Sequence, residues 1–434
     1  MMEKQQIIFV ERVPWAGGAE KVVYHLAHGL DKERFEPHVV CLFDQPNTLA
    51  VFSPEIKVRF IEPLTIVPPP QQSPPTGWRR RYLKWEGKLR HFLGIQPVRT
   101  MPLDFDDAGI SILLQSLGNW RPYVSGLRQI LKDFDANALL VPIMEEASVL
   151  VWLSQLFERR PYIVSLHSVE SYNMPLINPD PRRLAVEDWM LANACKSAET
   201  IVVPSNGCRT DLIQHYNIQP DRVQALPNPV DLDLMLAKRD SSNLRLPSAA
   251  KTKFVYVGRL AEDKNPALLV EAASLLKQTY DDFIVYFAGK GPLLDNLQSL
   301  SVAKGLTRHI VFLGELENPY PLMARARALI VTSHVESFSL VLVEAMYCGA
   351  VAISVDCPFG PREVLENGRF GLLSPQNDAA SLAESMQLIA CDDDLYHRLR
   401  ERGRERAQEY GLPRVIPDWE EMFASIAFKD DGKK

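Results

Sequence analysis

The 434-residue sequence is poor in cysteine and contains no long apolar stretch. Its six cysteines are scattered and form no C-x-x-C pair, so we expect reduced thiols in a cytoplasmic protein rather than disulfides or a zinc site. No run reaches the roughly 18 apolar residues of a membrane-spanning helix, so none is predicted. The apolar run at residues 7–10 has the length of a strand and is too short for the core of a signal peptide.

The sequence also lacks an excess of basic residues. Its 48 Lys and Arg stand against 54 Asp and Glu, which gives a net charge of −6 and argues against general nucleic-acid binding. Hydrophobic residues make up 46% and charged residues 24%, which excludes a disordered, collagen-like or coiled-coil chain. This length predicts two or three globular domains.

Short apolar runs alternate with longer helical patterns along the whole chain. Runs of strand character lie at residues 7–10, 38–42, 139–142, 162–166, 200–204, 254–258, 283–289, 309–314, 329–333 and 351–355. Continuous apolar runs are typical of strands buried on both faces, as in parallel sheets. We therefore predict an α/β protein of the doubly wound class, with two Rossmann-like domains that face each other across a cleft.

Prolines and polar residues at 227–247 interrupt this alternation and indicate a domain boundary. The predicted domains are residues 1–235 and 245–412, the first with a proline-rich insertion at residues 63–107. Residues 413–428 carry four apolar side chains at helical spacing, and we expect this helix to return to the first domain. These side chains are Trp419, Met422, Phe423 and Ile426.

Two glutamates flank the start of the helix predicted at residues 340–348. Glu336 lies in the loop after the strand at 329–333, and Glu344 lies one turn inside the helix. The free amides of Ser339 and Leu340 form an anion site at the helix N-terminus. An anion site between two carboxylates suits a sugar phosphate. The alternative is two ordinary surface glutamates around an amphipathic helix.

Two cations, Arg259 and Lys264, follow the strand at 254–258. Together they could hold a diphosphate, the arginine by its fork and the lysine as a point charge. A solvated loop is an equally good interpretation of these two residues alone. Gly291 follows the next strand, where glycine allows close approach of a ligand or simply forms a turn.

The first half contributes a glycine-rich loop and a histidine. Gly17 and Gly18 lie between the first strand and the first helix, but they do not form G-x-G-x-x-G, so a phosphate or sugar ring is favoured over a dinucleotide. His167 ends the strand at 162–166 and is expected to face the cleft. A lone histidine can equally be structural.

The order and spacing of these motifs resemble those of the retaining glycosyltransferases of family four, which have the GT-B fold. The resemblance extends from about residue 7 to residue 424. It rests on Gly17-Gly18-Ala19-Glu20, His167, Gly258-Arg259-Leu260 with Lys264, Gly289-x-Gly291-Pro292 and Glu336-x7-Glu344-Ala345.

The resemblance implies a nucleotide-sugar donor, expected to be a UDP-sugar, bound mainly by the second domain, with the acceptor on the first. Arg259 and Lys264 would bind the diphosphate and stabilise the leaving group. Glu344 would bind the ribose and Glu336 would lie beside the donor sugar, as would His167. The diphosphate would also contact the backbone of six residues, namely Gly17, Gly18, Gly291, Phe338, Ser339 and Leu340.

The resemblance further implies retention of anomeric configuration with the leaving phosphate as base, so no protein nucleophile, cofactor or bound metal is expected. Asp104, Asp106 and Asp107 are similar to the metal motif of the other glycosyltransferase fold, but their loop context argues against that role. Ser339 stands where the family commonly has glycine. Gly360-Pro361-Arg362-Glu363 is similar to transferases that extend lipid-linked sugars, including N-acetylhexosamine enzymes.

Residues 78–92 combine basic and aromatic side chains in an otherwise acidic protein. Lysine and arginine attract anionic lipids, and tryptophan suits the membrane interface. We therefore expect a peripheral protein on the cytoplasmic membrane face, with a glycolipid or lipid-linked glycan as acceptor. The alternative is an exposed helix whose aromatic side packs in the core. The residues expected at the membrane are Trp78, Arg79, Arg80, Arg81, Lys84 and Trp85.

Two other functions are compatible with the sequence. One is a GT-B enzyme with a soluble sugar acceptor, and the other is a two-lobed sugar-binding protein without turnover. Replacing Glu336 by alanine separates the second from an enzyme, because a binding protein has no turnover to lose.

Overall fold

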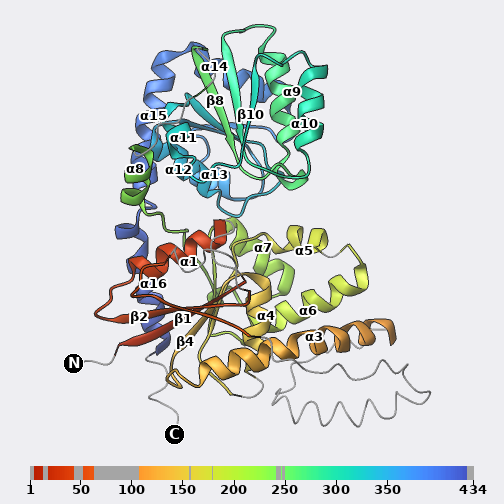
Figure 1. Cartoon of the computed structure of the whole chain (residues 1–434), viewed down its shortest axis with the longest axis vertical. Coiled ribbons are helices and arrows are strands. Elements are labelled where there is room, and N and C mark those ends of the chain that lie inside the picture. Colours follow the sequence, from red (N-terminus) through yellow and green to blue (C-terminus); the bar gives the residue numbers. More distant parts are fainter. Residues whose placement is uncertain are drawn as a thin grey trace.

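The computed structural model of the chain describes residues 4–12, 18–43, 52–62, 107–155, 158–177, 179–240, 246 and 250–427. It has two α/β halves, one stacked on the other along the long axis of the molecule (Figure 1). Each half has a parallel sheet with helices on both of its faces.

The N-terminal half is built on two parallel sheets, with the strand orders β3-β2-β1-β4 and β5-β6-β7. Isolated bridges pair Leu140 with Tyr162 and Ile143 with Ser165, so β5 continues the first sheet beside β4. The strands are β1 (Gln5–Glu11), β2 (Phe35–Cys41), β3 (Lys57–Phe60), β4 (Leu139–Pro142), β5 (Ile163–Ser165), β6 (Thr200–Val203) and β7 (Val223–Ala225).

The C-terminal half repeats this strand order in one six-stranded parallel sheet, β10-β9-β8-β11-β12-β13. In both halves the order reverses beside the first strand, and ligands of such sheets bind where it reverses, beyond the carboxyl ends of the strands. The strands are β8 (Thr252–Val257), β9 (Phe283–Ala288), β10 (Ile310–Gly314), β11 (Ala328–Val331), β12 (Val351–Val355) and β13 (Leu372–Ser374).

Helices cover both faces of each sheet, which explains the continuous apolar strands. Along β1, Ile7 and Phe9 enter one core cluster while Ile8 and Val10 enter another, as the two-residue period of a strand requires. The N-terminal half contains α1 (Gly18–Gly29), α3 (Asp107–Leu131), α4 (Met144–Ser154), α5 (Glu170–Ile177), α6 (Pro181–Ser197), α7 (Asn206–Tyr216) and a short 3-10 helix, η2 (Pro220–Arg222).

The C-terminal half begins its packing at α8, because Val230 and Met235 lie in a core cluster with Val255 and Tyr286. The remaining elements are α8 (Leu232–Asp240), a 3-10 helix η3 (Glu262–Lys264), α9 (Pro266–Leu276), α10 (Leu294–Ala303), α11 (Tyr320–Arg325), α12 (Leu340–Cys348), α13 (Gly360–Val364), α14 (Ala379–Cys391) and α15 (Asp393–Gln408).

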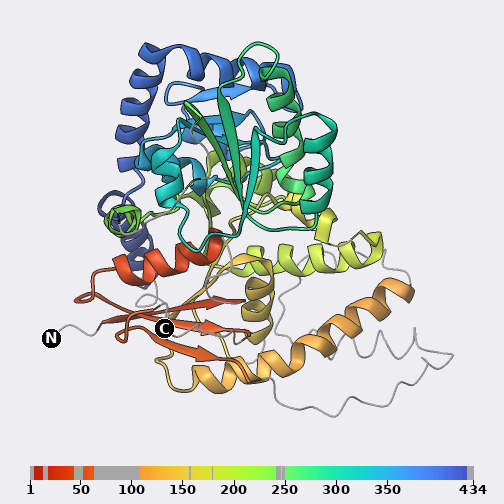
Figure 2. The same ribbon diagram turned by 45° about the horizontal axis from the view of Figure 1, so that its top comes forward.

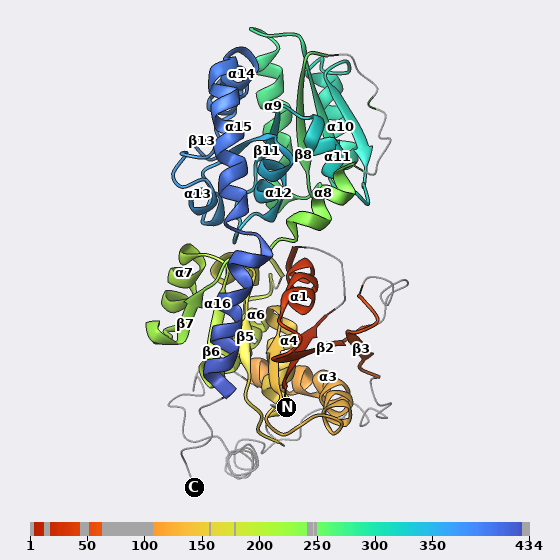
Figure 3. The same ribbon diagram turned by 90° about the vertical axis from the view of Figure 1, so that its left-hand side faces the viewer.

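The last helix, α16 (Leu412–Ala427), runs back along the N-terminal half (Figure 3). Its fully buried Trp419 and Phe423 share a core cluster with Phe9 of β1. The chain thus passes between the halves twice, and the two passages pair at Val230 and Gly411.

The predicted fold class is confirmed, and the predicted strands coincide with ten of the strands found. The three unpredicted strands are β3, β7 and β13, which end their sheets in the described part of the chain. Only one of the four residues of β3 is an apolar aliphatic one, and all four are partly or fully exposed. An edge strand needs no continuous apolar run, so the pattern used for the others does not detect it. The exact domain limits, 1–235 and 245–412, stay a prediction.

Candidate functional site

Lys264 and Glu336 form an ion pair beyond the carboxyl ends of β8 and β11. Their Nζ and Oε1 atoms are 2.7 Å apart, and Ser333 donates a second hydrogen bond to the same Oε1, at 2.6 Å. Burial disfavours the charged form of Lys264, but the adjacent carboxylate outweighs it and raises the lysine pKa. The pair therefore supplies a fixed, mostly buried cation at the point where the strand order reverses.

Glu344 is paired with a lysine from the other half of the molecule. Its side chain is only 6% exposed, and Lys21 of α1 donates to it at 2.6 Å. The hydroxyl of Tyr320 lies 3.4 Å from the same oxygen, and burial followed by the charge of Glu344 raises the tyrosine pKa. Glu344 thus links the two halves across the site.

The N-termini of α1 and α12 meet between the two halves. Figure 2 shows α1, in red, between the N-terminal sheet and the C-terminal half. A Cβ atom on Gly18 would lie 3.7 Å from Leu340, the first residue of α12. Because helix N-termini present free amides and positive dipole ends, this is a favourable place for an anion.

Ser339, which caps α12, has a strained backbone. Its φ of 73° and ψ of 65° lie in the left-handed region, and its hydroxyl is buried without a hydrogen-bond partner. Such strain in a non-glycine residue costs about 1–3 kcal/mol and gathers at functional sites. Glycine, which is common at this position in the family that the sequence resembles, would remove both the backbone strain and the unpaired hydroxyl group.

Replacing Ser339 by glycine is expected to raise the free energy of unfolding by about 1 kcal/mol, the relieved strain being partly offset by the greater unfolded-state entropy of glycine. Chemical denaturation of the full chain, followed in its C-terminal half, measures this change in the free energy of unfolding. Ser339→Ala is the matched variant, because it removes the hydroxyl and keeps the strain. A glycine variant less stable than the alanine variant would show that the left-handed conformation is not costly here.

Arg259 lies beside this site and is largely exposed. Its side chain is 70% exposed and pairs with Asp263 at 2.8 Å, one turn along the loop. The loop is fixed from behind by Gly291, where a Cβ atom would come within 2.3 Å of the carbonyl oxygen of Leu260. Only glycine permits this approach, which holds the two loops together under the site.

Further polar contacts join the two halves around the site. Ser337 donates to the backbone oxygen of His167 at 2.5 Å, and its own carbonyl accepts from Ser205 at 2.7 Å. The Glu363 carboxylate accepts from the amides of Asn206 and Gly207 at the start of α7. A carboxylate at a helix N-terminus complements the helix dipole. Glu363 therefore has a positional role that its motif did not reveal.

His167 is buried, with both ring nitrogens bonded within the protein. Nδ1 donates to the amide oxygen of Asn228 at 2.9 Å, and Nε2 accepts from Ser165 at 2.9 Å. Burial lowers the pKa of His167 to about 4, so the ring is neutral at pH 7. The predicted contact with a donor sugar therefore requires a face of the ring or the exchange of one of these bonds.

The low pKa of His167 predicts acid sensitivity. An unfolded histidine binds a proton below about pH 6.5, whereas this folded one does so only below about 4. The unfolded state thus binds more protons between these values, so stability is full above pH 6.5 and falls by about 3 kcal/mol on reaching pH 4. In this pH window, the unfolding free energy of His167→Gln should change less steeply with pH than that of the wild type. The difference in slope should correspond to at most one bound proton. Exposed His397→Gln should keep the wild-type slope.

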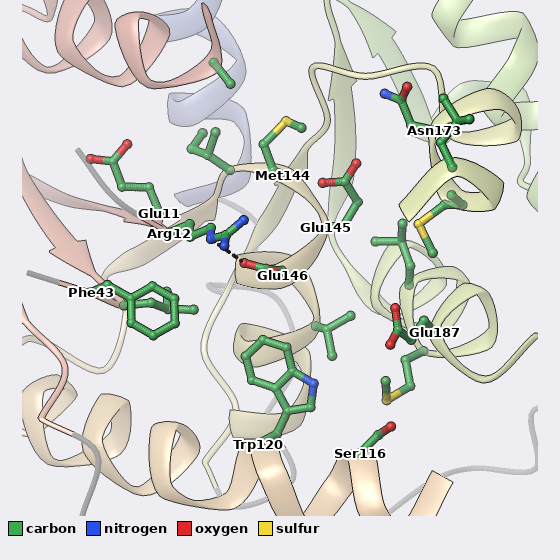
Figure 4. A pocket seen from close by; sticks show the side chains of 18 of the residues that line it. Glu11, Arg12, Phe43, Ser116, Trp120, Met144, Glu145, Glu146, Asn173 and Glu187 are labelled. Carbon is green, nitrogen blue, oxygen red and sulfur yellow. Dashed lines mark ion pairs between the residues drawn. The ribbon is translucent and has the colours of Figure 1, made fainter. Parts of the chain in front are cut away.

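A cavity of about 910 Å³ lies in the N-terminal half and extends to the loop that carries Arg259. Figure 4 shows part of its lining, with Trp120 from α3, Glu145 and Glu146 from α4, and Glu187 from α6. Arg12, after β1, forms an ion pair with Glu146 at 3.2 Å. Arg259 was predicted from the sequence as a site residue, whereas Arg12, Trp120, Glu145, Glu146 and Glu187 were not.

The structure thus brings together Lys264 with Glu336, and Gly18 with Leu340, and it places Arg259 at the edge of the adjoining cavity. Gly17 and the segment with the predicted membrane contacts lie outside the described residues. That segment comprises Trp78, Arg79, Arg80, Arg81, Lys84 and Trp85. Among the helices in the described ranges, none is long and apolar enough to cross a membrane.

Two family models match the chain. The model described as "Glycosyl transferases group 1" matches residues 241–406, and "Glycosyltransferase Family 4" matches residues 110–234. The Anabaena protein HepE, solved in complex with UDP-glucose, superimposes with a TM-score of 0.73 at 18% identity, covering 97% of this chain and 99% of that one. At this identity the likeness shows the fold alone.

Two curated relatives share part of the sequence. One is the N-acetylgalactosamine-N,N'-diacetylbacillosaminyl-diphospho-undecaprenol 4-alpha-N-acetylgalactosaminyltransferase of Campylobacter jejuni, 29% identical over 54% of this chain and 62% of its own length. The other is the phosphatidyl-myo-inositol mannosyltransferase of Mycobacterium leprae, 30% identical over 50% of this chain and 58% of its own. The chain thus spans less than two thirds of each.

The two family models follow one another along the chain, and each lies within one of the two α/β halves. The structural likeness adds the two-domain architecture over nearly the whole length. The chain therefore belongs to the group 1 glycosyltransferases with the GT-B fold.

Proposed function

We propose that this glycosyltransferase moves a hexosyl unit, with retention of configuration, from a UDP-sugar to a lipid-linked glycan. The observation that carries the proposal is the partly buried Lys264–Glu336 pair at the point where the strand order of the C-terminal sheet reverses. A partly buried lysine held charged near a helix N-terminus suits a diphosphate leaving group.

In the proposed complex, Lys264 and Arg259 bind the diphosphate, and the amides of Phe338, Ser339 and Leu340 complete its surroundings. Arg259 leaves its exposed partner Asp263 to do so, which costs little because surface ion pairs are weak. The ribose hydroxyls take the place of Lys21 at Glu344. Gly18, and with it Gly17, closes over the phosphates from the N-terminal half.

Retention follows in this proposal from attack on the face that the diphosphate leaves, with the leaving phosphate as base. The two cations offset the developing charge, so the reaction is proposed to need neither a protein nucleophile nor a metal. His167 is proposed to contact the donor sugar while remaining neutral, because its pKa lies far below 7.

A lipid-linked acceptor is supported by the names of relatives. The Campylobacter jejuni protein is named for an undecaprenol diphosphate acceptor and the Mycobacterium leprae protein for a phosphatidylinositol one. UDP as the donor nucleotide is supported by the UDP-glucose bound in the HepE structure. The contact of Trp78 to Trp85 with a membrane stays a prediction from sequence.

Release of nucleoside diphosphate from a panel of nucleotide sugars tests the proposal, with and without liposomes of total membrane lipid. Release that needs one UDP-sugar and the lipid would support it. Release of nucleoside diphosphate that does not depend on lipid would indicate a soluble acceptor. If the folded protein releases none from any donor, the sugar-binding alternative is favoured. A parallel series with EDTA should show undiminished activity.

A further inference from the structure

The cavity of the N-terminal half adjoins the proposed donor site. It is lined from that half by α3, α4, α5 and α6, and from the other half by Arg259, Glu262 and Asp263. Its volume of about 910 Å³ is within the range of small-molecule sites, roughly 300–1,000 Å³. Because both substrates must meet at the donor sugar, a cavity that reaches the Arg259 loop is in the right place for the acceptor.

Aromatic side chains form one side of this cavity. The ring of Tyr123 lies between those of Trp120, 6.1 Å away, and Phe43, 5.7 Å away, and both contacts are edge-on. All three side chains are partly or largely exposed. The electron-rich face of such a ring attracts the C–H groups of a pyranose, so the cluster can stack on a sugar.

The charges that line the cavity have an acidic balance. Six lining residues are carboxylates and three are arginines, with no lysine among them, which leaves a formal net charge of −3. Each arginine has a carboxylate partner: Arg12 with Glu146 at 3.2 Å, Arg183 with Glu187 at 2.8 Å and Arg259 with Asp263 at 2.8 Å. Carboxylates accept hydrogen bonds from hydroxyl and amide groups, whereas they repel phosphates and carboxylates.

Glu145 is held so that it presents this charge to the cavity. Ser168 donates to its Oε1 at 2.8 Å and also bonds to the buried Glu170. Burial, and then the charge of Glu145, raise the pKa of Glu170 well above its ordinary value. Glu170 therefore binds a proton more readily than an ordinary carboxyl, and Ser168 links it to Glu145 at the wall of the cavity.

We propose that this cavity binds an uncharged terminal sugar ring of the acceptor and excludes anionic ones. The aromatic cluster packs against the ring and Glu145 accepts from its hydroxyl or acetamido groups. Any phosphates of the acceptor then lie outside the cavity. This inference rests on the proposed function, because it treats the cavity as the acceptor site.

Saturation-transfer NMR with simple glycosides tests the inference without turnover. The probes are methyl α-glucoside and methyl N-acetyl-α-galactosaminide against methyl α-glucuronide, with UDP present to occupy the donor site. We expect the neutral glycosides to bind about tenfold more tightly than the glucuronide. Trp120→Ala should weaken neutral binding about tenfold, and Trp120→Phe should largely restore it.

Charge variants provide the second arm of this experiment. Glu145→Gln should weaken binding of the neutral glycosides, and Glu187→Gln should improve binding of the glucuronide because it releases Arg183. Glu271→Gln, exposed on α9, is the matched control and should change neither. The glucuronide binding as well as the glucoside, or neutral binding that ignores Trp120→Ala, would overturn the inference.

Two outcomes of these experiments distinguish a failure of this inference from a failure of the proposed function. If no neutral glycoside binds but the protein still releases UDP from a UDP-sugar, the cavity is not the acceptor site and the transferase stands. If no donor is cleaved while neutral glycosides bind in the cavity, the proposed function fails and the cavity remains a sugar site.

Discussion

Replacing Lys264 by alanine is expected to lower donor turnover by about two to three orders of magnitude, the effect of removing one group that stabilises a developing anion. The side chain is only 26% exposed and its ammonium group lies 2.7 Å from Glu336, so the charge has a fixed position beside the proposed diphosphate site. Steady-state release of nucleoside diphosphate measures the loss, which should appear mainly in kcat. Lys290→Ala is the control, since that lysine follows β9 but is 73% exposed and pairs with Glu315.

The same substitution leaves the largely buried Glu336 without its cation and with only the hydrogen bond from Ser333, at a cost of about 3 kcal/mol of stability. A double variant, Lys264→Met with Glu336→Leu, removes both charges and should recover most of this loss while remaining inactive. Activity near the wild-type level in a folded Lys264→Ala protein would exclude the lysine from the site. Inactivity that the double variant reverses would show that stability alone was at fault.

Replacing Trp419 by alanine is expected to destabilise the N-terminal half by about 3–5 kcal/mol, as for other large side chains removed from a core. Trp419 is fully buried and packs beside Phe423, with a ring separation of 5.8 Å. Both belong to the cluster that contains Ile7 and Phe9, although they lie more than 400 residues away in sequence. Urea unfolding followed by hydrogen exchange in each half should show the N-terminal transition moving alone.

The exposed Glu421 of the same helix supplies the matched control, and Glu421→Ala should change stability by less than about 0.5 kcal/mol. Equal shifts of both transitions would mean that the halves unfold as one unit. An unchanged N-terminal transition would show that α16 is dispensable to that core.

The sequence predicts the interior of this fold better than its edges. Central strands such as β9 and β11 are apolar throughout because helices cover both of their faces, and that pattern is local. The edge strands β3 and β13 carry partly exposed residues and resemble loops. Their pairing depends on the neighbouring strand, which a local pattern does not reveal.

A similar division applies to the site. Lys264 and Glu336 each follow a strand, and parallel strands bring their carboxyl ends together, so their proximity was predictable. The pairing of Lys21 with Glu344 depends on how the two halves face each other, and no motif encodes it. The cavity beside Arg259 likewise draws on five helices of the N-terminal half and on the other half, so its residues could be recognised only together.

The position of α16 has a consequence for biosynthesis. Val415 to Ile426 are synthesised after the whole of the C-terminal half, yet they complete a core that begins with Ile7. The two clusters of the C-terminal half use residues between Val230 and Tyr410 only, so that half can close while α16 is still being translated. Domains usually fold in the order in which they are made. Here the half that is synthesised first is completed only after the second half has been made, and its uncovered sheet face must be protected from aggregation until α16 packs against it.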